Sequence, residues 1–369
     1  MRRRRLTSTD MEAPIRVLMI TTGWPELQAE LQEIPTTHFI KRQADFLRAA
    51  GVEVDVFAFR GRRSVGNYLR AWLQARAALT RRRYDLVHAQ WCHNGLIAFP
   101  KRLPLVVTCR GFDLHGMILD RSGRQTLAGR LLPWLSRVIA ERADAVILVS
   151  EHMKRLLDPS TPVHVIPSGL DFDLFRIIPR DEARRHLGLP ADKRLVLFAG
   201  DPQSPRKRGA LAREAVDLLN GSLAAELVVA WAVPHTDMPF FMNACDAMVF
   251  TSRQEGSPNV VKEALACNLP VVSVPVGDVP ERITGVAGCE LCADDRPETI
   301  AAALERVLRR GGRAAGREAV RDLDERRTTQ HVIAIYRAVL GRALQPTAAA
   351  VRERPAERAT AAAVAHPAP

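Results

Sequence analysis

The sequence contains no hydrophobic run long enough to cross a membrane. Spanning a bilayer takes roughly 18 to 20 apolar residues in succession, and none of the 369 residues lies in such a run. The first residues, Met1-Arg-Arg-Arg-Arg-Leu-Thr-Ser, carry charge with no apolar stretch behind it, so we expect neither a classical export signal nor an integral membrane segment. Residues 1–14 are polar and rich in arginine, and we predict that they form a disordered leader.

Cysteine is scarce, and its spacing does not favour a metal site. The six cysteines lie mostly within apolar stretches, where free thiols behave as small core residues. Such thiols suit a reducing compartment, so we predict a cytoplasmic protein. Cys289-Glu-Leu-Cys292 is the single CxxC, and the two further ligands that a structural zinc site needs are not nearby. We therefore expect no metal.

Dinucleotide-binding and nucleic-acid-binding signatures are absent as well. Neither leading strand is followed by GxGxxG, because the two loops read Thr21-Thr-Gly-Trp-Pro25 and Gly200-Asp-Pro-Gln-Ser204, which argues against an NAD-dependent dehydrogenase. The net charge of +12 predicts an anionic partner. The basic residues lack a helix-turn-helix or aromatic-interleaved RNA signature, so we predict no nucleic-acid partner and keep a phosphorylated ligand or an acidic lipid.

What the sequence does contain is a long alternation of apolar strands and helical stretches. The predicted strands are 15–20, 52–57, 86–88, 105–108, 145–149, 163–166, 194–199, 226–233, 247–251 and 270–274. The main predicted helices are 37–50, 207–219, 239–244, 258–267, 297–310 and 330–340. Strands that alternate with helices predict parallel sheets in an α/β fold.

The turn-rich segment Pro167-Ser-Gly-Leu-Asp171 divides this alternation into two. We predict an N-terminal Rossmann-like domain over 15–166 and a C-terminal one over 167–328. A helix at 329–344 is expected to return towards the first domain. The tail at 345–369, rich in Ala, Pro and Arg without apolar periodicity, is predicted to be disordered.

The segment Glu255-Gly-Ser-Pro-Asn-Val-Val-Lys-Glu263 predicts a phosphate site. Ser257 can cap the amides of a helix and Pro258 suits its first position, so the pair predicts a helix start with free N–H groups facing the loop. Such a terminus binds phosphate oxygens, and Gly256 lets a ligand approach the backbone.

Charged residues around that helix extend the prediction to a nucleoside-diphosphate sugar. Arg206-Lys207-Arg208 can neutralise a pyrophosphate. The alternative is that these residues are simply solvated at the start of a helix. Glu263, near the second helical turn, can accept hydrogen bonds from the vicinal hydroxyls of a ribose. Glu255, on the loop, is placed where the sugar beyond the phosphates would lie.

Glu255 and Glu263 are spaced like the paired glutamates of the retaining glycosyltransferases of family 4, also called glycosyl transferases group 1, and the sequence resembles that family. Residues 264–281 are similar to it too. The segments Asp85-Leu-Val-His-Ala89, Ala143-Asp-Ala-Val-Ile-Leu-Val-Ser150 and Val165-Ile-Pro-Ser-Gly-Leu-Asp171 resemble family landmarks in the same order. The resemblance covers residues 15–340 and implies the GT-B fold, with two facing Rossmann-like domains and a cleft between them.

The resemblance also implies roles for individual residues. Glu255 would stabilise charge at the anomeric carbon of the donor sugar, as the catalytic residue, while Glu263 would hold the ribose and Lys207 the diphosphate. The full donor-binding set is Gly23, Arg206, Lys207, Gly256, Ser257, Asn259, Val260 and Glu263. The family chemistry requires neither metal nor cofactor, since cationic side chains and helix amides can stabilise the departing diphosphate.

Three departures from the family pattern bear on this expectation. Asp201 stands where an arginine often follows the first strand of the second domain, and Arg206 is the expected substitute. The family's His-Gly-x-Asp turn reads Arg110-Gly-Phe-Asp113, and a permanent cation cannot serve as a base. Arg110, Asp113 and His93 are the acceptor-side candidates. The span 220–246 is short, as if one strand–helix unit were missing.

Residues 60–84 hold eight arginines and no acid, with Tyr68, Leu69, Trp72 and Leu73 at helical spacing. Such a helix can lie on an anionic membrane surface, or it can turn its apolar residues to the core. The segment Leu131-Leu-Pro-Trp-Leu135, flanked by arginines, favours the membrane.

The predicted function is retaining, hexosyltransferase-like transfer from a nucleoside-diphosphate sugar to a saccharide or lipid-linked acceptor, in polysaccharide or glycolipid assembly. The cytoplasmic face of a membrane would suit this work. A sugar-nucleotide epimerase, a phosphorylase and a sugar-nucleotide-binding pseudoenzyme remain as alternatives.

Overall fold

The structure is a computed structural model that describes residues 13–30, 37–61, 64–116 and 127–341. The tail predicted at 345–369 lies outside the described residues, as does the leader except for residues 13 and 14. No helix in the described ranges is both long enough and apolar enough to cross a membrane.

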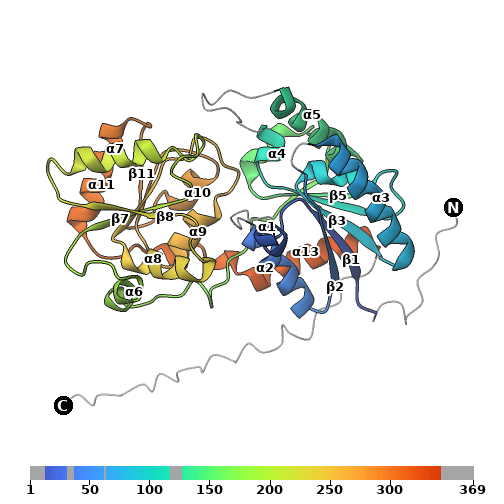
Figure 1. The fold of residues 1–369 in the computed structure, drawn as a ribbon, viewed down its shortest axis with the longest axis horizontal. Coiled ribbons are helices and arrows are strands. Elements are labelled where there is room, and N and C mark those ends of the chain that lie inside the picture. Colours follow the sequence, from blue (N-terminus) through green and yellow to red (C-terminus); the bar gives the residue numbers. More distant parts are fainter. Residues whose placement is uncertain (1–12, 31–36, 62–63, 117–126, 342–369) are drawn as a thin grey trace, which may run out of the picture.

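The N-terminal domain is built on a parallel six-stranded sheet (Figure 1). Its strand order is β2-β1-β3-β4-β5-β6. The strands are β1 (Arg16–Thr21), β2 (Glu53–Ala58), β3 (Leu86–Gln90), β4 (Leu105–Cys109), β5 (Ala145–Leu148) and β6 (Val163–Val165). Every residue of β3, β4 and β5 is buried, as expected of parallel strands that are covered on both faces.

Helices cover the two faces of this sheet. On one face α2 (His38–Ala49) packs through Ile40, Ala44 and Leu47. The opposite face is covered by α3 (Val65–Arg81), α5 (Leu127–Arg142) and the short 3₁₀ helix η2 (Cys92–Ala98). Two further short helices, α1 (Pro25–Glu30) and α4 (Phe112–His115), follow the ends of β1 and β4, and the 3₁₀ helix η3 (Glu151–Leu156) follows β5.

The C-terminal domain repeats the plan with a parallel five-stranded sheet of order β11-β10-β9-β7-β8. Its strands are β7 (Leu195–Ala199), β8 (Glu226–Ala230), β9 (Ala247–Phe250), β10 (Val271–Ser273) and β11 (Glu290–Leu291). Its main helices are α6 (Arg180–Leu187), α7 (Gly209–Leu219), α8 (Met238–Ala244), α9 (Asn259–Ala266), α10 (Val279–Ile283) and α11 (Pro297–Arg310). The predicted α/β fold with two parallel-sheet domains is confirmed. The two-residue strand β11 was not predicted.

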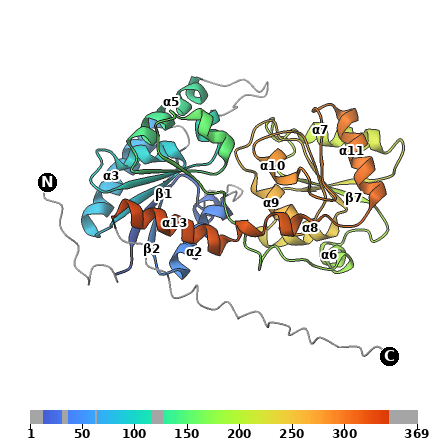
Figure 2. The same ribbon diagram turned by 180° about the vertical axis from the view of Figure 1, so that it is seen from behind.

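Two segments of the chain cross between the domains and lie side by side. Leu170 on the outgoing segment pairs with Asp324 on the returning one, through N–H···O bonds of 2.7 Å to Leu323 and 2.8 Å from Glu325. The last described helix, α13 (Glu325–Val339), then runs along the N-terminal domain (Figure 2). Its Tyr336 hydroxyl lies 2.6 Å from Nδ1 of His88, inside the N-terminal core. The C-terminal helix is therefore part of the first domain's packing.

Candidate functional site

The loop after β9 and the helix α9 carry the two glutamates singled out from the sequence. Helix α9 begins at Asn259, with Pro258 as its N-cap and no side chain bonded to its first amides. The prediction that Ser257 caps this helix is wrong, because its hydroxyl donates to Asp278 Oδ2 at 2.7 Å. Asp278 is fully buried and competes for that hydroxyl. The amides of the first helical turn are thus left for a ligand.

Three charged residues meet on the loop side of this helix start. Glu255 Oε1 accepts from Arg206 Nη1 at 2.5 Å and from Lys207 Nζ at 2.8 Å. Both basic residues precede α7, which begins at Gly209. Both side chains cross to the loop after β9, where Lys207 is mostly buried and Arg206 is partly exposed. The third basic residue, Arg208, turns away and binds the Thr251 carbonyl and Asp295.

The two cations keep Glu255 ionised. Burial acts to raise the pKa of the Glu255 carboxyl, but the charges of Lys207 and Arg206 outweigh it and hold that pKa below its ordinary value. Burial lowers the pKa of Lys207, and the attraction of Glu255 opposes this. One carboxylate oxygen thus holds two cations that a more highly charged anion, such as a diphosphate, could take over.

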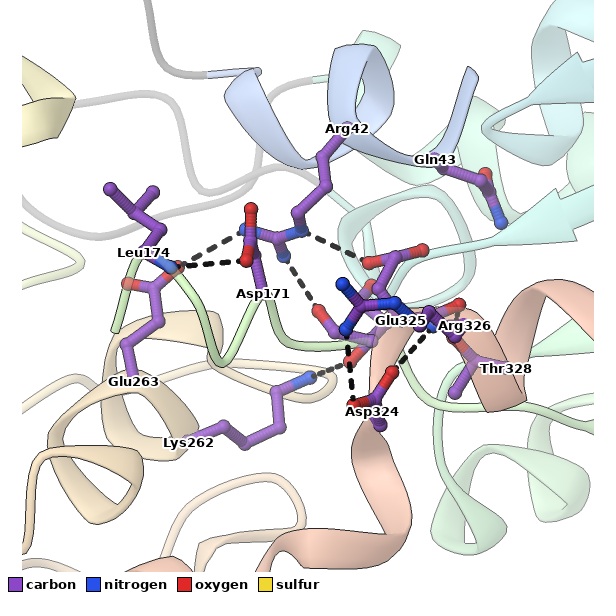
Figure 3. A network of polar contacts seen from close by, with 12 residues as sticks. Arg42, Gln43, Asp171, Leu174, Lys262, Glu263, Asp324, Glu325, Arg326 and Thr328 are labelled. Atoms are coloured by element: carbon purple, nitrogen blue, oxygen red, sulfur yellow. Dashed lines mark hydrogen bonds and ion pairs between the residues drawn. The ribbon is translucent and has the colours of Figure 1, made fainter. Parts of the chain in front are cut away.

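Glu263 lies on α9 and faces the N-terminal domain. Its Oε1 is 3.8 Å from His235 Nε2. The same oxygen is 3.9 Å from Nη1 of Arg42, which comes from α2 (Figure 3). Burial favours the neutral acid, yet the hydrogen bond and charge of His235, with the charge of Arg42, lower the pKa of Glu263. A buried, ionised carboxylate is suited to accept from hydroxyl groups.

The turn from Arg110 to Asp113 in the N-terminal domain is fixed by hydrogen bonds to the Asp113 carboxylate. Asp113 accepts from the backbone N–H groups of Cys92, Arg110 and Gly111 at 2.8 to 3.0 Å. Burial raises the pKa of Asp113, and these backbone bonds oppose the rise. The carboxylate of this acceptor-side candidate therefore organises the turn.

Arg110 is fixed by neutral partners from three segments. Its guanidinium donates to Gln90 Oε1 at 3.0 and 2.5 Å, to Gln43 Oε1 at 3.1 Å and to Ser168 Oγ at 2.8 Å. It also lies over the ring of Phe39, 4.7 Å from the centroid. Burial lowers the pKa of Arg110 to about 10, which leaves it cationic at neutral pH.

Glycines let the two domains touch between these sites. A Cβ on Gly111 would lie 2.9 Å from the Gly256 backbone, and one on Gly256 would lie 2.7 Å from the Arg110 carbonyl oxygen. Gly277 packs against the Glu255 and Gly256 carbonyls in the same way, at a φ of 58°. Such distances exclude any side chain, so the close approach of the domains requires glycine at Gly111 and Gly256, and the packing of two loops within the C-terminal domain requires it at Gly277.

The remaining predicted residues fall in different surroundings. His93 is buried, and this burial lowers its pKa to about 4, so its ring is neutral at pH 7. Gly23 is clamped by Thr21 Oγ1, and a Cβ there would lie 2.5 Å from Thr37. Asn259 and Val260 are partly exposed at the start of α9. His88 is a core residue, bonded to Thr108 as well as to Tyr336.

The described residues contain no group of three His, Cys, Asp or Glu side chains placed to hold a metal ion. All six cysteines are within the described ranges and are free thiols.

Sequence reasoning missed three residues that face Glu263 or its neighbours: Arg42, Lys262 and His235. Arg42 and Lys262 are both buried charges at the junction of the domains. The sequence around a charged residue on an amphipathic helix does not predict which residue of another domain will contact it. Lys262 did carry one available signal, because it adjoins Glu263 in a short, largely apolar helix.

Two family models match consecutive parts of the chain. "Glycosyltransferase Family 4" matches residues 12–174, and "Glycosyl transferases group 1" matches residues 185–310. The first covers the N-terminal domain and the second covers most of the C-terminal domain.

Named relatives agree with these matches. A D-inositol 3-phosphate glycosyltransferase 1 of Catenulispora acidiphila is 30% identical over 253 residues, which are 56% of this chain and 59% of that protein. A D-inositol 3-phosphate glycosyltransferase of Mycobacterium bovis is 28% identical over 309 residues, or 70% of this chain and 62% of that one. The chain thus spans less than two thirds of the length of either relative.

Solved structures share the fold. Sucrose-phosphate synthase from Thermosynechococcus elongatus superposes with a TM-score of 0.73 at 17% identity, over 89% of this chain and all of that one. Anabaena HepE, solved in complex with UDP and glucose, gives a TM-score of 0.61 at 19% identity, over 89% and 98% of the two chains. At such identities the likeness establishes the two-domain fold.

Proposed function

The chain belongs to glycosyltransferase family 4, and on that basis we propose that it transfers a sugar from a nucleoside-diphosphate sugar to a saccharide or lipid-linked acceptor, with retention of anomeric configuration. The observation that carries the proposal is the convergence of Arg206 and Lys207 on Glu255, beside the uncapped start of α9. The domain arrangement is that of GT-B enzymes, and the fold neighbour HepE has been solved in complex with UDP-glucose.

The charges of the site suit the departure of a diphosphate. In the proposed reaction the two cations exchange Glu255 for phosphate oxygens, and the α9 amides bind the same group. Charge that develops on the leaving oxygen is then stabilised by groups already in place. Glu255, released from its cations, faces the positive charge that develops at the anomeric carbon. The hydroxyl of the acceptor takes the sugar on the face that the diphosphate leaves.

Arg110 cannot accept a proton from the acceptor, and Asp113 is occupied by backbone amides. The leaving diphosphate is therefore the base that we propose for the acceptor hydroxyl, as a front-face displacement needs no protein nucleophile. In this scheme two cations and the helix amides do the work of a metal, so we expect turnover to continue in EDTA.

Acceptor-dependent diphosphate release tests the transfer. The purified protein is offered UDP- and GDP-sugars, first by thermal shift and then with acceptors that include oligosaccharides, lipid-linked sugars and D-inositol 3-phosphate. Transfer requires release that rises with the acceptor. A product isomeric with the donor and no release would identify an epimerase, and turnover that consumes phosphate would identify a phosphorylase. Donor binding without any turnover would identify a sugar-nucleotide-binding pseudoenzyme.

We propose that the acceptor is lipid-linked and met at an anionic membrane surface on the cytoplasmic side. Seven of the ten large hydrophobic side chains exposed in the described ranges lie on one face of the N-terminal domain. They are Val65, Leu69, Leu73, Leu96, Leu127, Leu131 and Trp134. They belong to α3, η2 and α5, which cover the same face of the sheet (Figure 1).

Both predicted roles of the basic helix find support in α3. Ala71 and Ala75 are buried and Tyr68 and Trp72 pack against the core, while Leu69 and Leu73 are more than half exposed. Arg70, Arg81, Arg83, Arg130 and Arg137 are exposed around them. Apolar side chains ringed by arginine suit anionic lipid.

Flotation with vesicles of phosphatidylglycerol and phosphatidylcholine tests this surface. We expect binding that weakens as salt is raised and that is lost in Leu131→Glu/Trp134→Glu, while nucleotide binding persists. A protein that stays with the soluble fraction at low salt would refute the membrane proposal and leave the transfer proposal standing.

A further inference from the structure

The guanidinium of Arg42 reaches from the N-terminal domain to the glutamate proposed to hold the donor ribose. Arg42 lies on α2 and is 8% exposed. Its Nε donates to Glu325 Oε2 at 3.0 Å, at the start of α13, and its Nη2 donates to the Gly169 carbonyl at 2.6 Å, in the connecting segment. These bonds fix the guanidinium plane at the junction of both domains (Figure 3).

The third nitrogen of this group is unused. Nη1 of Arg42 is buried and has no hydrogen-bond partner, and it points to Glu263 Oε1 at 3.9 Å. That distance is too long for a direct hydrogen bond. A hydroxyl placed between them could accept from Nη1 and donate to the carboxylate, at about 2.8 Å from each. Leaving such a donor unpaired in a buried site is unfavourable, which favours a ligand that fills the gap.

A second residue of α2, His38, also lies close to Glu263 and supports a ligand position there. His38, one helical turn before Arg42, stacks on His235 of the C-terminal domain, with ring centroids 4.5 Å apart and planes at 13°. His235 Nε2 lies 3.8 Å from the same Glu263 oxygen. Two residues of α2 therefore lie near Glu263: Arg42 faces it directly, and His38 stacks on His235, which faces it.

We infer that Arg42 is a donor-positioning residue, and that its Nη1 donates a hydrogen bond to a ribose hydroxyl that in turn donates to Glu263. This inference rests on the proposed function, since it names an additional contact for the same nucleotide. It makes recognition of the ribose a property of both domains. A nucleotide bound this way also holds the domains together, because α2 and α9 then share one hydroxyl.

Nucleotides that lack one hydroxyl test the inference. The dissociation constants of UDP, 2′-deoxy-UDP and 3′-deoxy-UDP are measured by calorimetry, with the GDP series used instead if GDP binds more tightly. For the unaltered protein we expect one of the two deoxy forms to bind roughly 10- to 100-fold more weakly, as the loss of a hydrogen bond to a charged group predicts. In Arg42→Gln that ratio should fall at least about five-fold, because the ribonucleotide alone loses a partner.

The ratio of the deoxynucleotide and ribonucleotide dissociation constants shows whether Arg42 binds the ribose or only stabilises the domain junction. If Arg42 were only structural, Arg42→Gln would weaken ribo and deoxy forms equally and leave the ratio unchanged, and this result would overturn the inference. Glu325→Gln is the matched control, because it removes a junction partner of Arg42 and keeps Nη1, so it should preserve the ratio. Arg42→Lys, which keeps the charge and loses the fork, provides a second variant with the same expected direction.

The outcomes also separate this inference from the proposed function. Nucleotide binding by the unaltered protein without discrimination between ribo and deoxy forms would overturn the inference and leave the proposed donor intact. Failure of the unaltered protein to bind either diphosphate would overturn the proposed donor and the inference with it.

Discussion

On the N-terminal side of the Gly111–Gly256 contact, polar groups are satisfied by the backbone and by neutral side chains of fixed position. On the C-terminal side, Glu255 is satisfied by two long cationic side chains that a stronger anion can displace. The first arrangement preserves a shape, because Asp113 is fully buried and both of its carboxylate oxygens accept from backbone N–H groups. The second can exchange partners without breaking the fold. The chemistry is therefore concentrated on the C-terminal side.

The largest effect should come from removing the charge of Glu255. In Glu255→Gln we expect the rate of acceptor-dependent diphosphate release to fall about 10²- to 10³-fold, the usual cost of losing one group that stabilises transition-state charge. Nucleotide affinity should change much less, because Arg206 and Lys207 are both freed for the phosphates.

Glu290→Gln is the matched control, since Glu290, on strand β11 of the same domain, also binds an arginine, Arg306 of α11, at 2.7 Å. Its turnover should equal that of the unaltered protein. If Glu255→Gln transferred sugar at an undiminished rate, the cluster of Glu255 with Arg206 and Lys207 would not be the catalytic part of the site.

The N-terminal side should respond to mutation in stability rather than in nucleotide binding. In Asp113→Asn an amide N–H₂ replaces one acceptor oxygen, so at least one of three backbone N–H groups loses its partner in a buried site. We expect the free energy of unfolding to fall by about 2 kcal/mol, as measured by urea denaturation, with the dissociation constant for the nucleotide unchanged.

Asp158→Asn serves as the control for that experiment. Asp158 also accepts from a backbone N–H, that of Ser160, but it lies in an exposed turn, so its denaturation midpoint should not move. A stable Asp113→Asn protein with an altered Michaelis constant for the acceptor would reverse the interpretation, and would return Asp113 to direct acceptor recognition.

The same contrast explains what could be predicted from the sequence. Strand β4 was predicted at 105–108 and occupies Leu105–Cys109, and β7 was predicted at 194–199 and occupies Leu195–Ala199, since buried parallel strands are continuous apolar runs. Arg206 and Lys207 were predicted to face the Glu255 loop across a pyrophosphate, but their direct pairing with Glu255 was not predicted. Both segments follow strands of one parallel sheet, whose carboxyl ends meet at one edge.

Contacts between domains could not be predicted in this way. Arg42 and Glu263 are 221 positions apart, and no local pattern states which helix face of one domain will meet the other. Ser257 failed for a related reason, because a capping preference is weak and a buried partner 21 residues away, Asp278, outweighed it. Strand β11 was missed because two residues carry no periodicity.

The two sides of the comparison meet at Ser168, and a pH experiment can test that junction. The Ser168 hydroxyl accepts from Arg110 of the N-terminal domain, and its carbonyl accepts from Lys262 Nζ of α9 at 3.1 Å. Lys262 has no exposed surface, and burial lowers its pKa to about 8, against the attraction of Asp278.

Between pH 8 and 10 the folded protein therefore releases the Lys262 proton while the unfolded chain, with an ordinary lysine pKa of about 10.4, keeps it. Since the unfolded state then binds more protons, the free energy of unfolding should rise with pH, by about 2 kcal/mol relative to Lys262→Met over this range. Below pH 8 both states are protonated and the difference between the proteins should become constant. Urea denaturation at pH 7, 8, 9 and 10 measures it, and groups shared by both proteins cancel. Lys154→Met, at an exposed site, should give a curve parallel to that of the unaltered protein, whereas a parallel curve for Lys262→Met would mean that Lys262 stays charged at the junction.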